Sequence, residues 1–274
     1  MKSSRRVFLG GSLAVAGLPA PVLAFAGKQP GGIRLGVATY SLRKFSRPEA
    51  IGILKKLGVE YVSIKEFHLH YAESPEQTEE GAREFRNAGF VVLSGGNISL
   101  QKPAELRTMF DYAKAAGMPM MVCAPTHETL PEVERLVKEY DIKAAIHNHG
   151  PEDKHFPTPQ SVLKAVKNMD ARMGLCLDIG HTARTGADII EAVREAGPRL
   201  FDIHVKDLQS TTDKATQVPV GDGVLPVAAM FKTLRAGNYK GAVMLEYEID
   251  ADNPFQGMQK SLAYMRGVLA GLAA

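Results

Sequence analysis

Short runs of apolar and β-branched residues alternate with amphipathic segments from residue 33 onward. The runs are almost continuously hydrophobic, which is typical of strands buried on both faces of a parallel sheet. Many amphipathic segments begin near Ser or Pro and several end at Gly, as helices do. Eight strands are predicted, at 33–40, 60–67, 90–95, 119–124, 142–148, 173–178, 200–206 and 242–248.

Helices are predicted between these strands and after the last one. Eight strand–helix units in about 250 residues is the usual size of a (β/α)8 TIM barrel, an α/β fold. An open doubly wound sheet is the alternative, but the sequence LGVATYSLRKFS at the first strand lacks a Gly-rich phosphate fingerprint. No internal linker divides the chain, so we expect one barrel domain. The predicted helices cover 46–58, 74–89, 103–117, 130–140, 159–169, 188–196, 226–236 and 255 to the end.

The first 26 residues differ from this pattern. Lys2, Arg5 and Arg6 precede an apolar stretch and a small-residue cleavage site, which predicts a cleavable signal peptide over 1–26 and a barrel over 27–274. The segment SRRVFL resembles the twin-arginine export signal. A transmembrane helix is the weaker alternative, because Gly and Pro interrupt the short apolar run. We therefore expect an exported, periplasmic protein without a stable membrane anchor.

Composition and charge narrow the function further. With 45% hydrophobic and 23% charged residues, the chain has the composition of a globular protein. Its net charge of +3 belongs to the predicted signal, because 1–26 holds three basic residues and no acidic one, which leaves 30 of each in the barrel. A nucleic-acid partner is not expected, because such affinity comes from clustered Lys and Arg. Cys123 and Cys176 lie in apolar runs and are predicted to be buried free thiols.

Four late strands end in side chains that bind metals. Catalytic groups of TIM barrels lie at the C-terminal ends of the strands. Because side chains alternate along a strand, one residue from each of the four can converge at the barrel mouth. His147, Asp178, His204 and Glu246 form a mixed imidazole and carboxylate set that suits one divalent ion, without distinguishing Mn, Co, Zn, Fe and Mg.

Each of these residues also has a structural interpretation. A single His at a strand end is usually a core or surface residue with its hydrogen bonds satisfied, and a single Asp there is often the N-cap of the next helix. Four consecutive strands that all end in such residues favour the metal site over chance.

Neighbouring residues are candidates for catalysis and substrate binding. His149 and Glu248 lie one strand step beyond the candidate ligands and, together with Glu246, are predicted to transfer protons. Lys206 is predicted to orient a carbonyl or carboxylate of the substrate; alternatively, it pairs with Asp207 or Glu248.

The segment SIKEFHLH follows the second strand onto the same mouth. Lys65 and Glu66 are candidates for acid–base catalysis and His68 for substrate contact; alternatively, the segment is a solvated loop. Asn97 and His127 are weaker candidates at the ends of the third and fourth strands.

The motifs AIHNHG, LCLDIGHTARTGAD, LFDIHVKDL and AVMLEYE resemble the xylose isomerase-like TIM-barrel superfamily, the sugar phosphate isomerases/epimerases. The resemblance implies metal ligands at Asp178, His204 and Glu246 and places His181 against the substrate. Epimerases of the superfamily usually carry Glu on the fifth strand, where this chain has His147. That exchange removes one of two symmetric bases, and relatives that resemble this variant include dehydratases and lyases.

The predicted function is therefore a metal-dependent sugar isomerase or epimerase. It would remove the proton α to a carbonyl of a non-phosphorylated keto-sugar through an enediolate. One alternative is a lyase or dehydratase that eliminates a β oxygen from a 3-keto-glycoside or an inosose-like substrate. A second is a non-catalytic exported sugar-binding barrel. A three-zinc nuclease resembling endonuclease IV is set aside, because too few ligands can be placed and the barrel lacks a basic surface. The expected partner is a small sugar, and an oligomer is compatible with the sequence.

Overall fold

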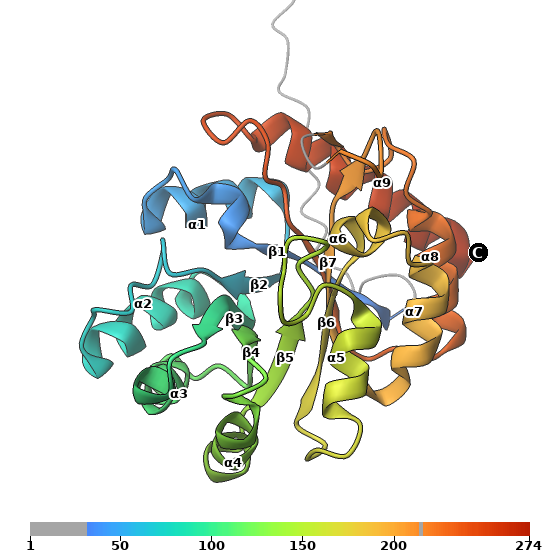
Figure 1. Cartoon of the computed structure of the whole chain (residues 1–274). Helices are drawn as coiled ribbons and strands as arrows, with labels where there is room; N and C mark the ends of the chain where they lie inside the picture. The colour runs from blue at the N-terminus through green and yellow to red at the C-terminus, as the bar shows by residue number, and fades with distance from the viewer. Residues whose placement is uncertain (1–31, 214–215) are drawn as a thin grey trace, which may run out of the picture.

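Eight parallel strands close into a barrel in the computed structural model, which describes residues 32–213 and 216–274 (Figure 1). Around the barrel the order is β1-β10-β7-β6-β5-β4-β3-β2. The predicted TIM barrel is therefore confirmed. The barrel strands are β1 (Arg34–Ala38), β2 (Tyr61–Ile64), β3 (Val91–Leu100), β4 (Met120–Pro125), β5 (Lys143–His147), β6 (Met173–Asp178), β7 (Leu200–Val205) and β10 (Ala242–Leu245).

Helices surround the strands as an outer ring (Figure 1). Several helices begin with a capping box. At α2, for example, the Ser74 hydroxyl accepts the Gln77 N–H, and the Gln77 side-chain oxygen accepts the Ser74 N–H. The helices are α1 (Arg47–Leu57), α2 (Pro75–Asn87), α3 (Leu106–Ala115), α4 (Leu130–Tyr140), α5 (Pro159–Val166), α6 (Ile179–Arg184), α7 (Ile189–Ala196), α8 (Val227–Ala236) and α9 (Phe255–Ala273), with 3-10 turns η2 (Thr39–Leu42), η3 (Pro103–Glu105) and η4 (Gly197–Arg199).

Several predicted boundaries were wrong. β3 continues to Leu100 instead of ending at residue 95, with a register shift against β4 between Gly95 and Ile98. β10 ends at Leu245, so Glu246 and Glu248 follow the strand. Two further elements were not predicted: α6 and a small antiparallel hairpin made of β8 (Asp207–Leu208) and β9 (Gln217–Val218).

The strand register places the candidate ligands side by side. Asp178 at the end of β6 pairs with His204 of β7, and His204 pairs in turn with Met244 of β10. On the other side, His147 at the end of β5 pairs with Cys176 of β6. The polar ends of these four neighbouring strands therefore meet over one sector of the barrel mouth.

Both cysteines are buried and free, as predicted. No helix in 32–213 or 216–274 is both long enough and apolar enough to cross a membrane. The predicted signal peptide, 1–26, lies outside the described residues.

Candidate metal and substrate site

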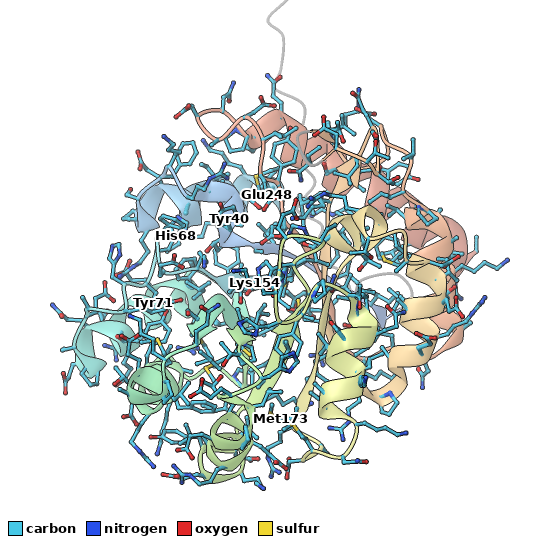
Figure 2. All side chains as sticks on the ribbon, in the orientation of Figure 1. Tyr40, His68, Tyr71, Lys154, Met173 and Glu248 are labelled. Atoms are coloured by element: carbon cyan, nitrogen blue, oxygen red, sulfur yellow. The ribbon has the colours of Figure 1, made fainter. Side chains whose placement is uncertain are left out.

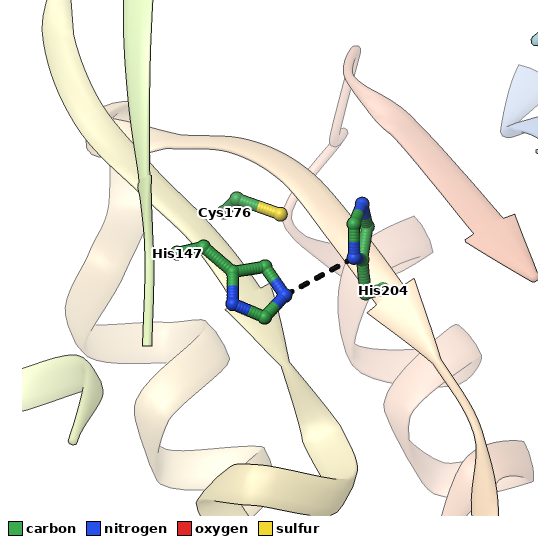
Figure 3. A group of neighbouring side chains, drawn as sticks. All are labelled: His147, Cys176 and His204. Carbon is green, nitrogen blue, oxygen red and sulfur yellow. Dashed lines mark hydrogen bonds between the residues drawn. The ribbon is translucent and has the colours of Figure 1, made fainter. Parts of the chain in front are cut away.

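Four donor side chains meet at the ends of β5, β6, β7 and β10. One ligand atom from each of His147, Asp178, His204 and Glu246 lies within 4.8 Å of the others. His147 Nε2 is 3.1 Å from His204 Nδ1 and 3.4 Å from Asp178 Oδ2. His204 Nδ1 is 3.3 Å from Glu246 Oε1. Figure 3 shows the two imidazoles facing each other beside Cys176. We call these four residues the ligand group.

Neighbouring residues hold Asp178 so that one oxygen is directed to the ligand group. Its Oδ1 accepts the His181 N–H at 2.8 Å and so caps α6. The Asn148 side-chain oxygen accepts the Asp178 N–H at 3.0 Å, and Asn148 Nδ2 donates to Thr182 Oγ1 at 3.1 Å. The helix-capping role and the ligand role of Asp178 therefore use different oxygens.

The ligand group fits a divalent cation. All four side chains are buried, and Asp178 Oδ2, which lies 3.4 Å from His147 Nε2, has no hydrogen-bond partner among the described residues, although it pairs with the Lys206 ammonium at 3.1 Å. A buried cluster of this kind is costly unless something satisfies it. Ligand atoms about 2.0–2.2 Å from one ion are at most about 4.4 Å apart, close to the separations found here.

The charge states of three of the four residues suit a metal. Burial lowers the pKa of His147 to about 3, so the ring is neutral near pH 7. Burial opposes ionisation of Asp178 and Glu246, but the Lys206 ammonium outweighs it and holds the pKa of each below its usual value. A neutral imidazole and ionised carboxylates are the forms that coordinate cations. His204 differs: burial opposes its protonation, but Cys176 and Glu246 outweigh burial and raise its pKa above the usual value, so its ring must lose a proton when it coordinates a cation.

Lys206 is buried among three carboxylates. Its Nζ lies 3.1 Å from Asp178 Oδ2, 2.9 Å from Glu246 Oε2 and 2.9 Å from Glu248 Oε2. The side chain passes over Gly180, where a Cβ atom would lie 2.6 Å from Lys206 Cγ. Both alternatives predicted for Lys206 therefore stay open: it pairs with Glu248, and it also stands at the ligand group.

His149 is held at the edge of the site. Its ring centroid is 4.3 Å from that of His147. Nε2 lies 2.7 Å from Asn97 Nδ2, and Nδ1 lies 3.3 Å from Asp153 Oδ2. With the amide donating to Nε2, the proton of the neutral ring is on Nδ1, facing Asp153. Burial lowers the pKa of His149, which leaves the ring neutral and able to accept a proton.

His181 lies on the same side of the site. Its ring centroid is 5.7 Å from that of His149 and 5.9 Å from that of His147. Arg184 Nη1 lies 3.3 Å from His181 Nδ1. The three histidines thus form a contiguous wall beside the ligand group.

In the segment after β2, Lys65 and Glu66 pair with each other, whereas His68 is buried and bonded on both sides of its ring. Lys65 Nζ contacts Glu66 Oε2 at 2.9 Å and donates to the Asn97 carbonyl at 2.8 Å. His68 is buried, with Nδ1 3.0 Å from Thr39 Oγ1 and Nε2 3.1 Å from the Leu42 carbonyl. Because both of its ring nitrogens are bonded within the protein, His68 has a structural role instead of the predicted substrate contact.

Several residues that shape the site were not predicted to do so. Asn148 and Gly180 sit inside recognised motifs but were given no role. Asp153 lies in a charged loop that gave no signal of its contact with His149. Asp202, on the inward face of β7, is also buried; burial raises its pKa to about 7, and its Oδ2 has no partner among the described residues.

The sequence matches the family described as "Xylose isomerase-like TIM barrel" over residues 51–268. The chain belongs to this family.

Among its relatives is an inosose dehydratase from Clostridium perfringens, 27% identical over 158 residues that cover 51% of this chain and 52% of the relative. The chain thus spans about half the length of the curated relatives it matches.

Solved structures show the same fold. A D-psicose 3-epimerase determined in the presence of D-fructose superposes with a TM-score of 0.70 at 17% identity, over 87% of this chain and 100% of that one. The IOLI protein, solved with a bound zinc atom, gives a TM-score of 0.72 at 17% identity, over 87% of this chain and 99% of that one.

Proposed function

We propose that the chain is a divalent-metal-dependent enzyme that removes the proton α to the carbonyl of a non-phosphorylated keto-sugar and thereby isomerises or epimerises it. The observation that carries the proposal is the buried ligand group, with its four donor atoms within 4.8 Å of one another. The zinc in the IOLI structure supports the metal, whose identity stays open for this chain.

The ligand group would hold the ion through His147, Asp178, His204 and Glu246. A bound divalent ion would withdraw electrons from the carbonyl and so make the α proton more acidic. The protein would supply the proton-transfer groups around it.

His149 is the side chain best placed to take the proton. Its contact with Asp153 favours the tautomer whose Nε2 lone pair faces Asn97, and a substrate C–H would replace that amide contact. The resulting imidazolium would be stabilised by the Asp153 carboxylate. Glu246 and Glu248 are the other proposed proton-transfer groups. Glu66 and Lys65 stand further round the mouth as acid–base candidates.

Lys206 and His181 would orient the substrate. The Lys206 ammonium donates to carboxylates now and would donate equally to a substrate oxygen that entered between them. Asp178, Glu246 and Glu248 contribute three negative charges and Lys206 one positive charge. A divalent ion, with His204 deprotonated on coordination, would bring this set to neutrality, which suits an uncharged sugar.

Elimination is the second candidate function, and one feature of the chain favours it. An imidazole, His147, stands where a two-base epimerase needs a carboxylate, and the relatives include an inosose dehydratase. In this reaction the α proton is lost and the electron pair of that C–H bond expels a β oxygen, which leaves as water or alcohol after protonation. A barrel that binds sugar without reacting is the remaining alternative.

Export to the periplasm is part of the proposal and rests on the signal-like 1–26 segment alone. An exported enzyme would meet few sugar phosphates, which supports a non-phosphorylated substrate.

Incubation of the metal-loaded protein with D-fructose or an inosose in deuterated water tests the proposal. Solvent deuterium at the α carbon of recovered sugar supports isomerisation or epimerisation. Loss of water with formation of an unsaturated ketone supports elimination. Finding neither deuterium in the recovered sugar nor an elimination product, across a panel of keto-sugars, would contradict both and leave the binding barrel.

A further inference from the structure

Two aromatic side chains meet at the barrel mouth, outside the ligand group. Phe67, in the turn after β2, is 40% exposed, and its ring centroid lies 6.0 Å from that of Tyr40, which follows β1. The two rings are tilted by 58°. Among the described residues, Tyr264 of α9 is the other large aromatic side chain with comparable exposure. We call Tyr40 and Phe67 the aromatic corner.

Arg43 joins the aromatic corner to the site. Its guanidinium carbon lies 4.8 Å from the Tyr40 ring centroid, a cation–π distance. Its Nη2 donates to the Glu248 carbonyl at 2.7 Å. The Glu248 carboxylate in turn contacts Lys206 at 2.9 Å. Tyr40 is therefore linked through Arg43 to the segment that carries Glu248; both residues are labelled in Figure 2.

The topology makes the two regions continuous. β2, β1, β10 and β7 are successive neighbours in the barrel. Their ends carry, in that order, Phe67, Tyr40, Glu248 and Lys206. The mouth thus changes from aromatic to charged along one arc. Small-molecule sites commonly combine an apolar wall with a few convergent polar groups, and this arc has that composition.

The aromatic corner suits a ring that does not react. The contacts that join it to the ligand group run through Arg43, Glu248 and Lys206, so it is offset from the place where the carbonyl would bind. A pyranose ring has one face of C–H groups, which can pack on an aromatic side chain while its hydroxyls stay hydrated. An exposed Phe beside a fixed Tyr offers such a surface.

We infer that Tyr40 and Phe67 form a subsite for a second sugar ring, so that the preferred ligand is a disaccharide. This inference rests on the proposed function, because it takes the ligand group as the place where the first ring binds. The inference specifies the size of the substrate, which the ligand group alone does not determine.

Calorimetric titration of the full, metal-loaded protein with disaccharides and methyl glycosides tests the subsite. The probes are cellobiose, maltose and trehalose, compared with methyl α- and β-D-glucoside. We expect at least one disaccharide to bind at least about tenfold more tightly than the methyl glycosides, equivalent to about 1.4 kcal/mol. Phe67→Ala should remove that preference, and Phe67→Trp should retain it.

Tyr264→Ala is the matched control, because it also removes an exposed aromatic ring but lies on α9. It should keep the disaccharide preference, and all variants should keep the wild-type metal content. Equal affinity for disaccharides and methyl glycosides would overturn the subsite, as would a preference that survives in Phe67→Ala.

Deuterium exchange measured on the same preparations separates this inference from the proposed function. Exchange without a disaccharide preference would overturn the subsite alone. A preference that depends on Phe67, without exchange on any keto-sugar, would support the subsite and contradict the proposed chemistry.

Discussion

His68 follows β2 and His147 ends β5, so both lie at the same barrel mouth, yet their hydrogen-bond partners differ. Both ring nitrogens of His68 are bonded, to Thr39 and to the Leu42 carbonyl. His147 has one nitrogen without a hydrogen-bond partner among the described residues and the other close to His204 and Asp178.

The difference shows what separates a structural histidine from a ligand. Protein groups complete the hydrogen bonds of His68, and the neutral ring then contributes to stability. The ligand group, in contrast, concentrates lone pairs and negative charge that the described side chains satisfy only in part. Burial alone does not separate the two regions, since both histidines are buried. What separates them is whether the protein supplies a hydrogen-bond partner to both ring nitrogens.

The largest expected effect comes from removing a ligand. Asp178→Asn should keep the bond that caps α6 through its side-chain oxygen but lose the negative charge directed at the ligand group. Even residues that only support metal ligands cost 10–100-fold in affinity, so we expect at least a hundredfold loss of metal affinity. Titration with Zn²⁺ or Mn²⁺ measures it, and His68→Gln serves as the control with unchanged affinity. Wild-type affinity in Asp178→Asn would contradict the assignment.

His68 should make the free energy of unfolding depend on pH. Burial first, with Arg47 nearby, lowers the pKa of His68 to about 4, against about 6.5 in an unfolded chain. The unfolded chain therefore binds the proton first as the pH falls. The stabilising contribution is complete above pH 6.5, declines towards pH 4 and amounts to about 3 kcal/mol. Denaturant unfolding of wild type and His68→Gln at several pH values measures it.

The two denaturation curves should differ in their slope against pH. In His68→Gln this part of the decline between pH 6.5 and 4 should be missing. Identical pH dependence in the two proteins would mean that burial does not hold His68 neutral.

Lys206 offers a way to change the charge of the ligand group without removing a ligand. Its ammonium already neutralises part of the charge on Asp178 and Glu246, so it competes with a metal. Lys206→Met should therefore raise the apparent metal affinity about tenfold, because the repulsion between the ammonium and the ion is gone. Activity should fall, because the substrate loses a donor. Weaker metal binding in Lys206→Met would show that the lysine supports the ligands instead of competing with the ion.

Gly180 gives the smallest and most local test. A Cβ atom at this position would come within 2.6 Å of Lys206 Cγ and 2.7 Å of its Cδ. Gly180→Ala should displace the lysine stem and lower activity about tenfold, since small misplacements at a site are expensive. Gly52→Ala on α1 is a matched control, because a Cβ there meets nothing within 4 Å. Equal activity in the two variants would mean that the Lys206 position is not critical.

The sequence predicted the barrel because its strands are long hydrophobic runs separated by clear helix signals. It did not predict α6, because this helix starts immediately at Asp178 without a break in the pattern. The β8–β9 hairpin has two residues in each strand, too few to produce a periodicity.

The ligand group could be predicted because four neighbouring strands end in donor residues. The structural role of His68 could not be predicted, because its side-chain partner Thr39 lies 29 positions away in the chain and contacts it only after the barrel closes. The same holds for Asn97, which lies 52 positions from His149 in the chain. Asp153 is only four residues from His149, and the turn of the loop brings the two side chains together.

Elemental analysis of the purified protein after metal-supplemented expression tests the central claim most directly. We predict about one divalent ion per chain in the wild type and in His68→Gln, and less than about one tenth of that in the double variant Asp178→Asn, Glu246→Gln. An ion-free wild type, or a double variant that keeps its ion while remaining folded, would contradict the assignment of the ligand group as a metal site.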